Sequence, residues 1–244
     1  MFKFSIITVT YNAGNLLRGT IESVLSQISS DYEYIIIDGG SSDNTQDIVH
    51  HYNTDKIIFV SEPDNGIYDA MNKGIKLAKG DYCMFLNAGD ELFDNNVLEK
   101  AVHLMDEKEY DIFFGEATYV YRDSKTRCLR PNLSMLPFSF CHQAMFFNTV
   151  MLKNNLYDVS YRFSGDSELV YRLYEKGWKM VILDLMMIKE LGGEGATERN
   201  LMKSTIELYS IPFLKNNLSP IRINFNKLKI RIYCLLRDTK LIRK

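Results

Sequence analysis

The stretch from Phe4 to Gly14, FSIITVTYNAG, decides the fold. Phe4 to Thr10 is a β-branched apolar run, and the four residues after it, YNAG, are typical of the turn that ends a buried strand. From Asn15 to Gln27 apolar residues recur at helical spacing, and Asn15 is available as the N-cap. The stretch therefore predicts a buried strand, a polar loop and a helix.

The same unit recurs through the first hundred residues. Further strands are predicted at Tyr34 to Ile37, Ile57 to Val60 and Tyr82 to Leu86, and further helices at Thr45 to Tyr52 and Ile67 to Leu77. Alternating strands and helices with apolar strands predict a mainly parallel sheet flanked by helices on both faces, an α/β fold. Ligands of such sheets bind beyond the carboxyl ends of the strands, so the polar loops after these strands form the expected site.

The pattern loosens after about residue 97. We predict a helix to Glu107, strands at 112–114, 117–122, 126–129 and 180–185, a helix at 165–176, and a long helix from about Glu198 to Asn216 with a kink at Pro212. The glycine-rich run 192–195 is expected to be a flexible loop. The chain thus divides into one main domain of residues 1–197 and a C-terminal helical extension of residues 198–244.

Charge is distributed unevenly along the 244 residues. From Leu218 onward eight basic residues stand against Asp238 alone, whereas the first 217 residues carry 21 basic and 30 acidic groups. The basic residues alternate with apolar ones, which predicts an amphipathic segment that contacts an anionic membrane surface, or a helix packed on the domain with a solvated basic face. The acidic body and the lack of a recognition motif argue against a nucleic acid partner.

Two further features bear on the class of protein. No stretch approaches eighteen uncharged apolar residues, and Met1 to Ile7 is too short for a signal peptide, so we expect a cytoplasmic body. The four cysteines, Cys83, Cys128, Cys141 and Cys234, form no C-x-x-C pair and are expected to be reduced and structural.

Polar residues that follow the predicted strands are candidates for binding. Tyr11 offers an aromatic ring for stacking on a nucleobase, or packs under its loop. Asp38 offers a carboxylate to a base or ribose, or starts a turn through its side chain. Asp90, in the loop Asn87-Ala88-Gly89-Asp90, offers a carboxylate to a hard divalent cation that also binds phosphate, or caps the following helix.

Taken in order, four segments resemble one known family. They are SIITVTYN from Ser5, IDGGSSDNT from Ile37, EPDNGIYDAMNKG from Glu62, and GDY at Gly80 continuing to LNAGD from Leu86. Together they are similar to the nucleotide-binding half of the family 2 inverting glycosyltransferases of GT-A fold. The DNGIYDAMNKG string resembles the branch found among bacterial enzymes that assemble exopolysaccharide and O-antigen repeat units.

The resemblance implies roles for residues of the first half, 1–96, which would bind the nucleotide-sugar. The implied contacts are Thr8, Tyr11, Asp38, Asp69, Lys73, Asn87 and Ala88. Asp69 and Lys73 also fit the polar face of an ordinary helix. Asp90 stands at the end of the family's D-x-D signature and would bind Mn²⁺ or Mg²⁺. Asn87 and Gly89 occupy positions where carboxylates are common, so Asp90 would bind the cation alone.

The second half, 97–197, would build the acceptor side. Asp166, in Ser164-Gly165-Asp166-Ser167-Glu168, resembles the family's acidic base, or is a helix N-cap. His142 and Gln143 interrupt an apolar run and would contact the donor phosphate or the acceptor, or His142 is a buried core histidine. Glu194 and Arg199 would lie in a lid near the diphosphate, or in a plain surface loop.

The expected activity is metal-dependent, inverting transfer of a hexose or N-acetylhexosamine from a UDP-sugar to an undecaprenyl-diphosphate-linked saccharide. The enzyme would work on the inner face of the cytoplasmic membrane. The missing carboxylates leave a second hypothesis, a degenerate scaffold that binds nucleotide-sugar without turnover. A nucleotidyltransferase is a third, but the YNAG loop lacks the glycine-rich basic character that such enzymes need after the first strand.

Overall fold

The computed structural model describes residues 3–52, 54–106, 109–121, 125–191 and 200–238. Its strands are β1 (Phe4–Thr10), β2 (Tyr32–Asp38), β3 (Ile57–Ser61), β4 (Tyr82–Phe85), β5 (Glu91–Leu92), β6 (Ile112–Val120), β7 (Thr126–Leu129), β8 (Met145–Asn148) and β9 (Met180–Leu191). Its helices are α1 (Gly14–Leu25), α2 (Thr45–His51), α3 (Ile67–Leu77), α4 (Val97–Met105), α5 (Thr149–Lys153), α6 (Gly165–Glu175), α8 (Leu201–Leu208), α9 (Pro212–Asn217) and α10 (Pro220–Asp238), with a 3₁₀ turn, η1, at His142–Ala144.

Within these residues all the strands join one sheet, in the order β3-β2-β1-β4-β8-β6-β9-β5, with β7 paired to β6. Strands β3, β2, β1 and β4 run parallel. Strand β8 is antiparallel to both β4 and β6, and β9 returns parallel to β6. The prediction of an α/β fold with a mainly parallel, mixed sheet is confirmed. Because β8 is reversed, the residues that precede it lie at the edge where the parallel strands end.

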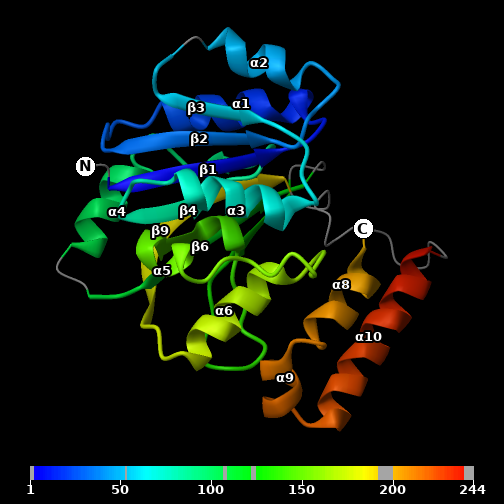
Figure 1. The fold of residues 1–244 in the computed structure, drawn as a ribbon. Helices are drawn as coiled ribbons and strands as arrows, with labels where there is room; N and C mark the ends of the chain where they lie inside the picture. Colours follow the sequence, from blue (N-terminus) through cyan, green and yellow to red (C-terminus); the bar gives the residue numbers. More distant parts are fainter. Residues whose placement is uncertain (1–2, 53, 107–108, 122–124, 192–199, 239–244) are drawn as a thin grey trace.

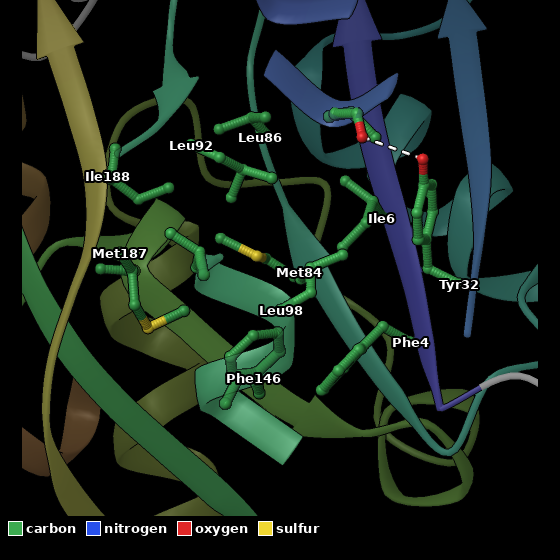
Figure 2. Packing of buried hydrophobic residues seen from close by; sticks show 14 of the residues in the cluster. Phe4, Ile6, Tyr32, Met84, Leu86, Leu92, Leu98, Phe146, Met187 and Ile188 are labelled. Carbon is green, nitrogen blue, oxygen red and sulfur yellow. Dashed lines mark hydrogen bonds between the residues drawn. The ribbon is translucent and has the colours of Figure 1, made fainter. Parts of the chain in front are cut away.

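Helices cover both faces of the sheet (Figure 1). One buried cluster joins α1, α2 and α4 to one face, and a second joins α3, α5 and α6 to the other. Figure 2 shows the first cluster, in which Phe4 and Phe146 pack together with ring centroids 4.7 Å apart. Every residue of β1 and β2 is buried, which is why these strands read as continuous apolar runs.

The first two strand-to-helix loops are joined to each other. Asn12 has a φ of 48°, and its backbone N–H donates to Ser41 Oγ over 2.7 Å. In return Asn12 Oδ1 accepts from the Ser42 N–H over 2.9 Å. Asparagine tolerates this left-handed backbone better than most residues. The turn after β1 and the glycine-rich turn after β2 therefore form one connected surface at the carboxyl edge.

The C-terminal helices differ from the expectation. Instead of one kinked helix, α8 ends at Leu208 and Pro212 opens α9, where its missing N–H costs nothing. Helices α8, α9 and α10 form a separate group beside α6 (Figure 1). A small buried cluster attaches them, in which the Tyr171 ring on α6 stacks on Phe213 with centroids 5.1 Å apart. The boundary between residues 1–197 and 198–244 stays a prediction.

Local boundaries are corrected in two places. Ala13, not Asn15, occupies the N-cap of α1, so Asn15 lies inside the helix. His142 and Gln143 lie in the turn η1 ahead of β8 rather than inside a strand. The four cysteines are free, as expected, and Cys128 on β7 is the exposed one. In the described part of the chain, no helix combines the length and apolar character needed to cross a bilayer.

Candidate functional site

A cavity of about 410 Å³ opens beside the carboxyl ends of the central strands. Four of the predicted site residues line it, namely Asn87, His142, Gln143 and Asp166. The wall also contains Glu190, Arg127 and several aromatic side chains, among them Tyr119, Phe140 and Phe163. Residues from both halves of the domain thus meet around one space. Aromatic walls with a few polar groups are typical of small-molecule sites.

Asp166 is the second residue of α6 and is partly exposed at the cavity wall. The N-cap of α6 is Ser164, so the alternative reading of Asp166 as N-cap is wrong. Burial raises the pKa of the Asp166 carboxyl to about 6, and the negative charge of Glu207 acts in the same direction. Hydrogen bonds from the Ser167 backbone and from Tyr68 oppose this rise. A carboxyl with such a pKa is ionised near neutral pH and accepts protons well.

Asp90 lies in a tight turn behind the cavity and is only 7% exposed. Its backbone N–H donates to Asn87 O over 3.0 Å, and Gln143 Nε2 donates to its Oδ2 over 3.1 Å. The alternative role as a helix cap is wrong, because β5 follows and α4 is capped by Asn96. Burial raises the pKa of the Asp90 carboxyl well above its ordinary value, and the charge of Glu190 raises it further.

Glu190 stands across from Asp90. Strands β5 and β9 pair Glu91 with Lys189 in an antiparallel register, so the next pair along is Asp90 and Glu190. Asn87 adds a carbonyl oxygen, Oδ1, which is buried without a hydrogen-bond partner. Carboxylate and amide oxygens of this kind fit a hard cation such as Mg²⁺ or Mn²⁺. In the described residues no three His, Cys, Asp or Glu side chains converge as a complete metal site, so the other ligands must come from elsewhere.

Tyr11 and Asp38 lie at the outer part of the same edge. The Tyr11 side chain is 65% exposed and is available for stacking. Asp38 is fully buried, and it accepts hydrogen bonds from the Ser41 backbone over 3.0 Å and from Ser61 Oγ over 2.6 Å. Its carboxylate therefore shapes the turn after β2, as the alternative reading anticipated. Asp64 and Tyr11 both lie beside Gly39, where a methyl group would contact each of them, and Asp64 was not predicted.

Four of the predicted contacts, Thr8, Asp69, Lys73 and Ala88, have partners within the protein. The Thr8 side chain is fully buried and its hydroxyl bonds Tyr34 Oη over 3.0 Å, so it packs inside the domain. Lys73 Nζ pairs with Glu62 at 2.9 Å and donates to Pro63 O at 2.7 Å. Asp69 accepts from the Asn65 N–H over 3.0 Å, and Ala88 packs against the core. Lys73 and Asp69 fix the loop that precedes α3.

His142 is a core histidine. Its Nε2 bonds Tyr157 Oη over 2.6 Å and its ring stacks on Phe85, with centroids 5.2 Å apart. Burial lowers the pKa of His142 to about 4, so the ring is neutral at physiological pH. It shapes the cavity wall without supplying charge. The predicted lid residues Glu194 and Arg199 lie outside the described residues.

Two acidic residues that act on the site were not predicted from the sequence, namely Glu190 at the cavity wall and Glu207 near Asp166. Glu190 was missed because the last strand was predicted to stop at Leu185, although the apolar run 185–188 signals a longer strand. Glu207 was missed because no motif surrounds it in the helix α8. Its carboxylate accepts backbone hydrogen bonds from residues more than forty positions earlier in the chain, which no local pattern reveals.

A family model and curated relatives match this sequence. The model of glycosyl transferase family 2 matches residues 5–167, more than half of the chain. A PGL/p-HBAD biosynthesis glycosyltransferase of Mycobacterium bovis is 31% identical over 179 residues, which cover 70% of this chain and 69% of the relative. An uncharacterized glycosyltransferase of Rickettsia prowazekii is 26% identical over 185 residues, covering 70% of this chain and 58% of the relative.

Solved structures share the fold at low sequence identity. TarS of S. aureus, residues 1–349 with UDP-GlcNAc, superposes with a TM-score of 0.67 at 17% identity, covering 91% of this chain and 69% of that one. The mannosyltransferase PcManGT from Pyrobaculum calidifontis, with GDP-Man and Mn²⁺, gives a TM-score of 0.68 at 13% identity over 95% of this chain and 69% of that one. These structures share the GT-A fold of this chain. Because the family model matches more than half of the sequence and the Mycobacterium bovis relative is 31% identical, the chain belongs to glycosyl transferase family 2 and is a glycosyltransferase.

Proposed function

We propose that this enzyme transfers a hexose or N-acetylhexosamine, with inversion at the anomeric carbon, from a UDP-sugar to a hydroxyl of a lipid-linked saccharide. Bacterial surface polysaccharide synthesis is the proposed setting. The observation that carries the proposal is the position of Asp166, a carboxyl of raised pKa at the wall of a cavity that also contains Asn87 and Gln143. Structural neighbours that hold UDP-GlcNAc and GDP-Man support a nucleotide-sugar donor.

Asp166 acts as the general base in this proposal. The acceptor oxygen attacks the anomeric carbon, the bond from that carbon to the diphosphate breaks, and the acceptor proton moves to the Asp166 carboxylate. The nucleoside diphosphate leaves with the bonding electron pair. Attack opposite the leaving group in a single displacement inverts the configuration. The ionised carboxylate is the reactive form, so the rate should fall below a pH of about 6 as Asp166 becomes protonated.

The donor would lie along the carboxyl edge, from Tyr11 to the cavity. Exposed Tyr11 would stack on the base, with Asp64 and the Asp38 turn beside it. Asp90 and Asn87 would hold a divalent cation, with Glu190 across from them. When bound, such a cation neutralises the charge that develops on the diphosphate leaving group. Aromatic rings of Tyr119 and Phe140 would line the acceptor side.

The proposal is tested by measuring nucleoside diphosphate release from UDP-, GDP- and dTDP-sugars, with and without Mn²⁺ and with water as acceptor. We expect slow, Mn²⁺-dependent hydrolysis of one UDP-sugar. The stereochemistry of the released sugar, read by NMR before mutarotation, should be inverted. Binding of UDP without turnover of any donor, including in the presence of a lipid-linked saccharide, would instead support the scaffold hypothesis.

Asp90→Ala should slow this hydrolysis at least about 100-fold at saturating donor, because loss of the cation removes several kcal/mol of stabilisation from the leaving group. The Mn²⁺ concentration for half-maximal activity should rise as well. Asp47→Ala, at an exposed position of α2, is the matched control and should leave both values unchanged. Equal hydrolysis by Asp90→Ala and wild type, with unaltered dependence on Mn²⁺, would rule out Asp90 as a ligand.

We propose that α10 binds the enzyme to an anionic membrane surface. Its exposed residues Ile221, Phe225, Leu228 and Ile232 recur at intervals of one helical turn and so form a single apolar stripe. Lys229 and Arg231 are exposed on the same helix. The other side of α10 packs on the protein, where Asn226 Nδ2 donates to Oη of Tyr209, the C-cap residue of α8, over 2.7 Å. An apolar stripe with basic neighbours is typical of helices that lie in a membrane interface.

Phe225→Asp should lower binding to vesicles of phosphatidylcholine with 30% phosphatidylglycerol by at least about tenfold, because a Phe side chain contributes about 2 kcal/mol when buried in the interface. Co-flotation measures the bound fraction. Val150→Asp is the control, since Val150 is equally exposed but lies on α5 of the main domain. If the wild-type protein does not bind the vesicles, or if Phe225→Asp and Val150→Asp reduce binding equally, α10 is not the membrane contact.

A further inference from the structure

The loop before α6 is held by one carboxylate from the C-terminal helices. Glu207, a partly buried residue of α8, accepts hydrogen bonds from three consecutive backbone N–H groups. The Arg162 N–H donates to Oε1 over 2.8 Å, and the Phe163 and Ser164 N–H groups donate to Oε2 over 2.6 and 2.7 Å. Hydrogen bonds to an ionised acceptor are about twice as strong as neutral ones. Glu207 thus fixes the backbone two residues ahead of Asp166.

Two further contacts hold the same loop, residues 162–165, and with Glu207 they form what we call the clamp. Ser164 Oγ donates to Ser204 O on α8 over 3.1 Å, which ties the N-cap residue of α6 to the same helix. From the main domain, Tyr68 Oη on α3 accepts from the Gly165 N–H over 2.9 Å. A methyl group on Gly165 would lie 2.8 Å from the Tyr68 ring, so the backbone and the ring are too close for any side chain between them. Four successive backbone N–H groups, from Arg162 to Gly165, are therefore held by two side chains from different parts of the chain.

We propose that Glu207 is a positioning residue for the base, so that the C-terminal helices set the place of the Asp166 carboxylate at the cavity wall. This inference rests on the proposed role of Asp166. The charge of Glu207 acts on Asp166 in addition, raising its pKa. Glu207 therefore has two separable effects, one through the backbone geometry and one through charge.

The chemistry explains why such a clamp matters. A general base works only when its oxygen lies within hydrogen-bond reach of the acceptor proton. A displacement of about 1 Å in a catalytic group costs on the order of 100-fold in rate. Asp166 is in the first turn of its helix, where backbone N–H groups lack partners inside the helix. Glu207 supplies a partner for the Ser164 N–H and Tyr68 one for the Gly165 N–H, and Glu207 also holds the two residues that lead into the helix.

Two variants of Glu207 separate the effect of geometry from that of charge in the donor hydrolysis assay. Glu207→Ala removes the acceptors and the charge, and we expect kcat to fall by on the order of 10- to 100-fold with donor KM within about twofold of wild type. Glu207→Gln keeps one oxygen, which can serve Phe163 and Ser164, but its amide faces the Arg162 N–H. We expect this variant to recover part of kcat. Both should shift the acid limb of the pH profile to lower pH, because the charge that raises the Asp166 pKa is gone.

Ile206→Ala is the control on the same helix, since Ile206 is exposed beside Glu207. It should keep the wild-type kcat and acid limb. Circular dichroism and the urea midpoint establish that each variant is folded. A folded Glu207→Ala enzyme with kcat within twofold of wild type and an unshifted acid limb would overturn the inference, even if its stability were lower. Wild-type activity in Asp166→Asn would instead refute the proposed base itself, so the two failures are distinguishable.

Discussion

Asp166→Asn is expected to lower kcat for donor hydrolysis by about 10²- to 10⁴-fold, the usual contribution of a positioned general base. The amide keeps the size and the hydrogen-bonding shape of the side chain but cannot accept a proton. Donor KM should change little, because the proposed partner of Asp166 is the acceptor hydroxyl and not the donor. Wild type should lose activity as the pH falls through about 6, the pKa of this carboxyl. The residual activity of the variant should lack that step.

The same substitution should make the protein more stable near neutral pH. The folded pKa of Asp166, about 6, exceeds the ordinary value of 3.8, so the folded protein binds more protons in this interval. Ionisation of Asp166 therefore costs stability as the pH rises from 3.8 to 6, and the cost persists above that range. After allowance for its partial exposure, the gain for Asp166→Asn is about 1 to 2 kcal/mol at pH 7.5.

Urea unfolding at two pH values measures this effect. The difference between Asp166→Asn and wild type should be present at pH 7.5 and vanish near pH 4, where the wild-type carboxyl is protonated in the folded protein. Asp47→Asn, at an exposed site, should show no difference at either pH. If Asp166→Asn retains more than a tenth of wild-type kcat, or is less stable than wild type at pH 7.5, Asp166 is not a general base whose pKa is raised by the fold.

Phe146→Ala should reduce the free energy of unfolding by about 3 to 5 kcal/mol, because it removes a fully buried ring and leaves a cavity. Phe146 lies on β8, in the middle of the sheet, and packs beside Phe4 and Leu98 (Figure 2). Its loss weakens the contact of α4 with the sheet at the point where parallel and antiparallel strands meet. The measurement is urea denaturation followed by circular dichroism.

Phe225→Ala is the matched control for this prediction. It makes the same chemical change at a side chain that is 65% exposed on α10, and its effect should stay within about 0.5 kcal/mol. An equal loss of stability in both variants would show that α10 contributes to the cooperative core. A loss below about 1 kcal/mol for Phe146→Ala would show that the surrounding side chains collapse into the space.

The first half of the fold was predictable because its signals are local. The helix at Ile67 to Leu77 was predicted at its observed bounds, and β1 was found from its apolar run alone. The second half depends on pairing between distant segments. Nothing local reveals that β8 runs antiparallel between β4 and β6, or that β9 continues beyond Leu185 to pair with β5. Pro212 was noticed, but it begins the separate helix α9 rather than kinking a longer one.

For the candidate site too, the local features were predictable and the contacts between distant residues were not. Asn87, Gln143 and Asp166 were predicted, and the structure brings them to one cavity. The sequence showed residue type and position relative to a strand end, but not the partner of each side chain. Thr8 was an implied contact of the nucleotide-sugar, yet its buried hydroxyl bonds Tyr34 Oη inside the domain. Lys73 was an implied contact of the nucleotide-sugar, yet Glu62 lies within 2.9 Å of its ammonium group.

Cys128 gives the native protein a ready attachment point for a reporter dye. The other three cysteines, Cys83, Cys141 and Cys234, are buried, so a maleimide applied to the folded enzyme should modify Cys128 alone. Since burial and the neighbouring Glu116 raise the pKa of the Cys128 thiol, labelling should proceed faster at mildly alkaline pH. Side chains alternate along β7, and its neighbours Arg127 and Leu129 line the cavity. A fluorophore would therefore sit on the outer side of the cavity wall and report acceptor binding without any engineered residue.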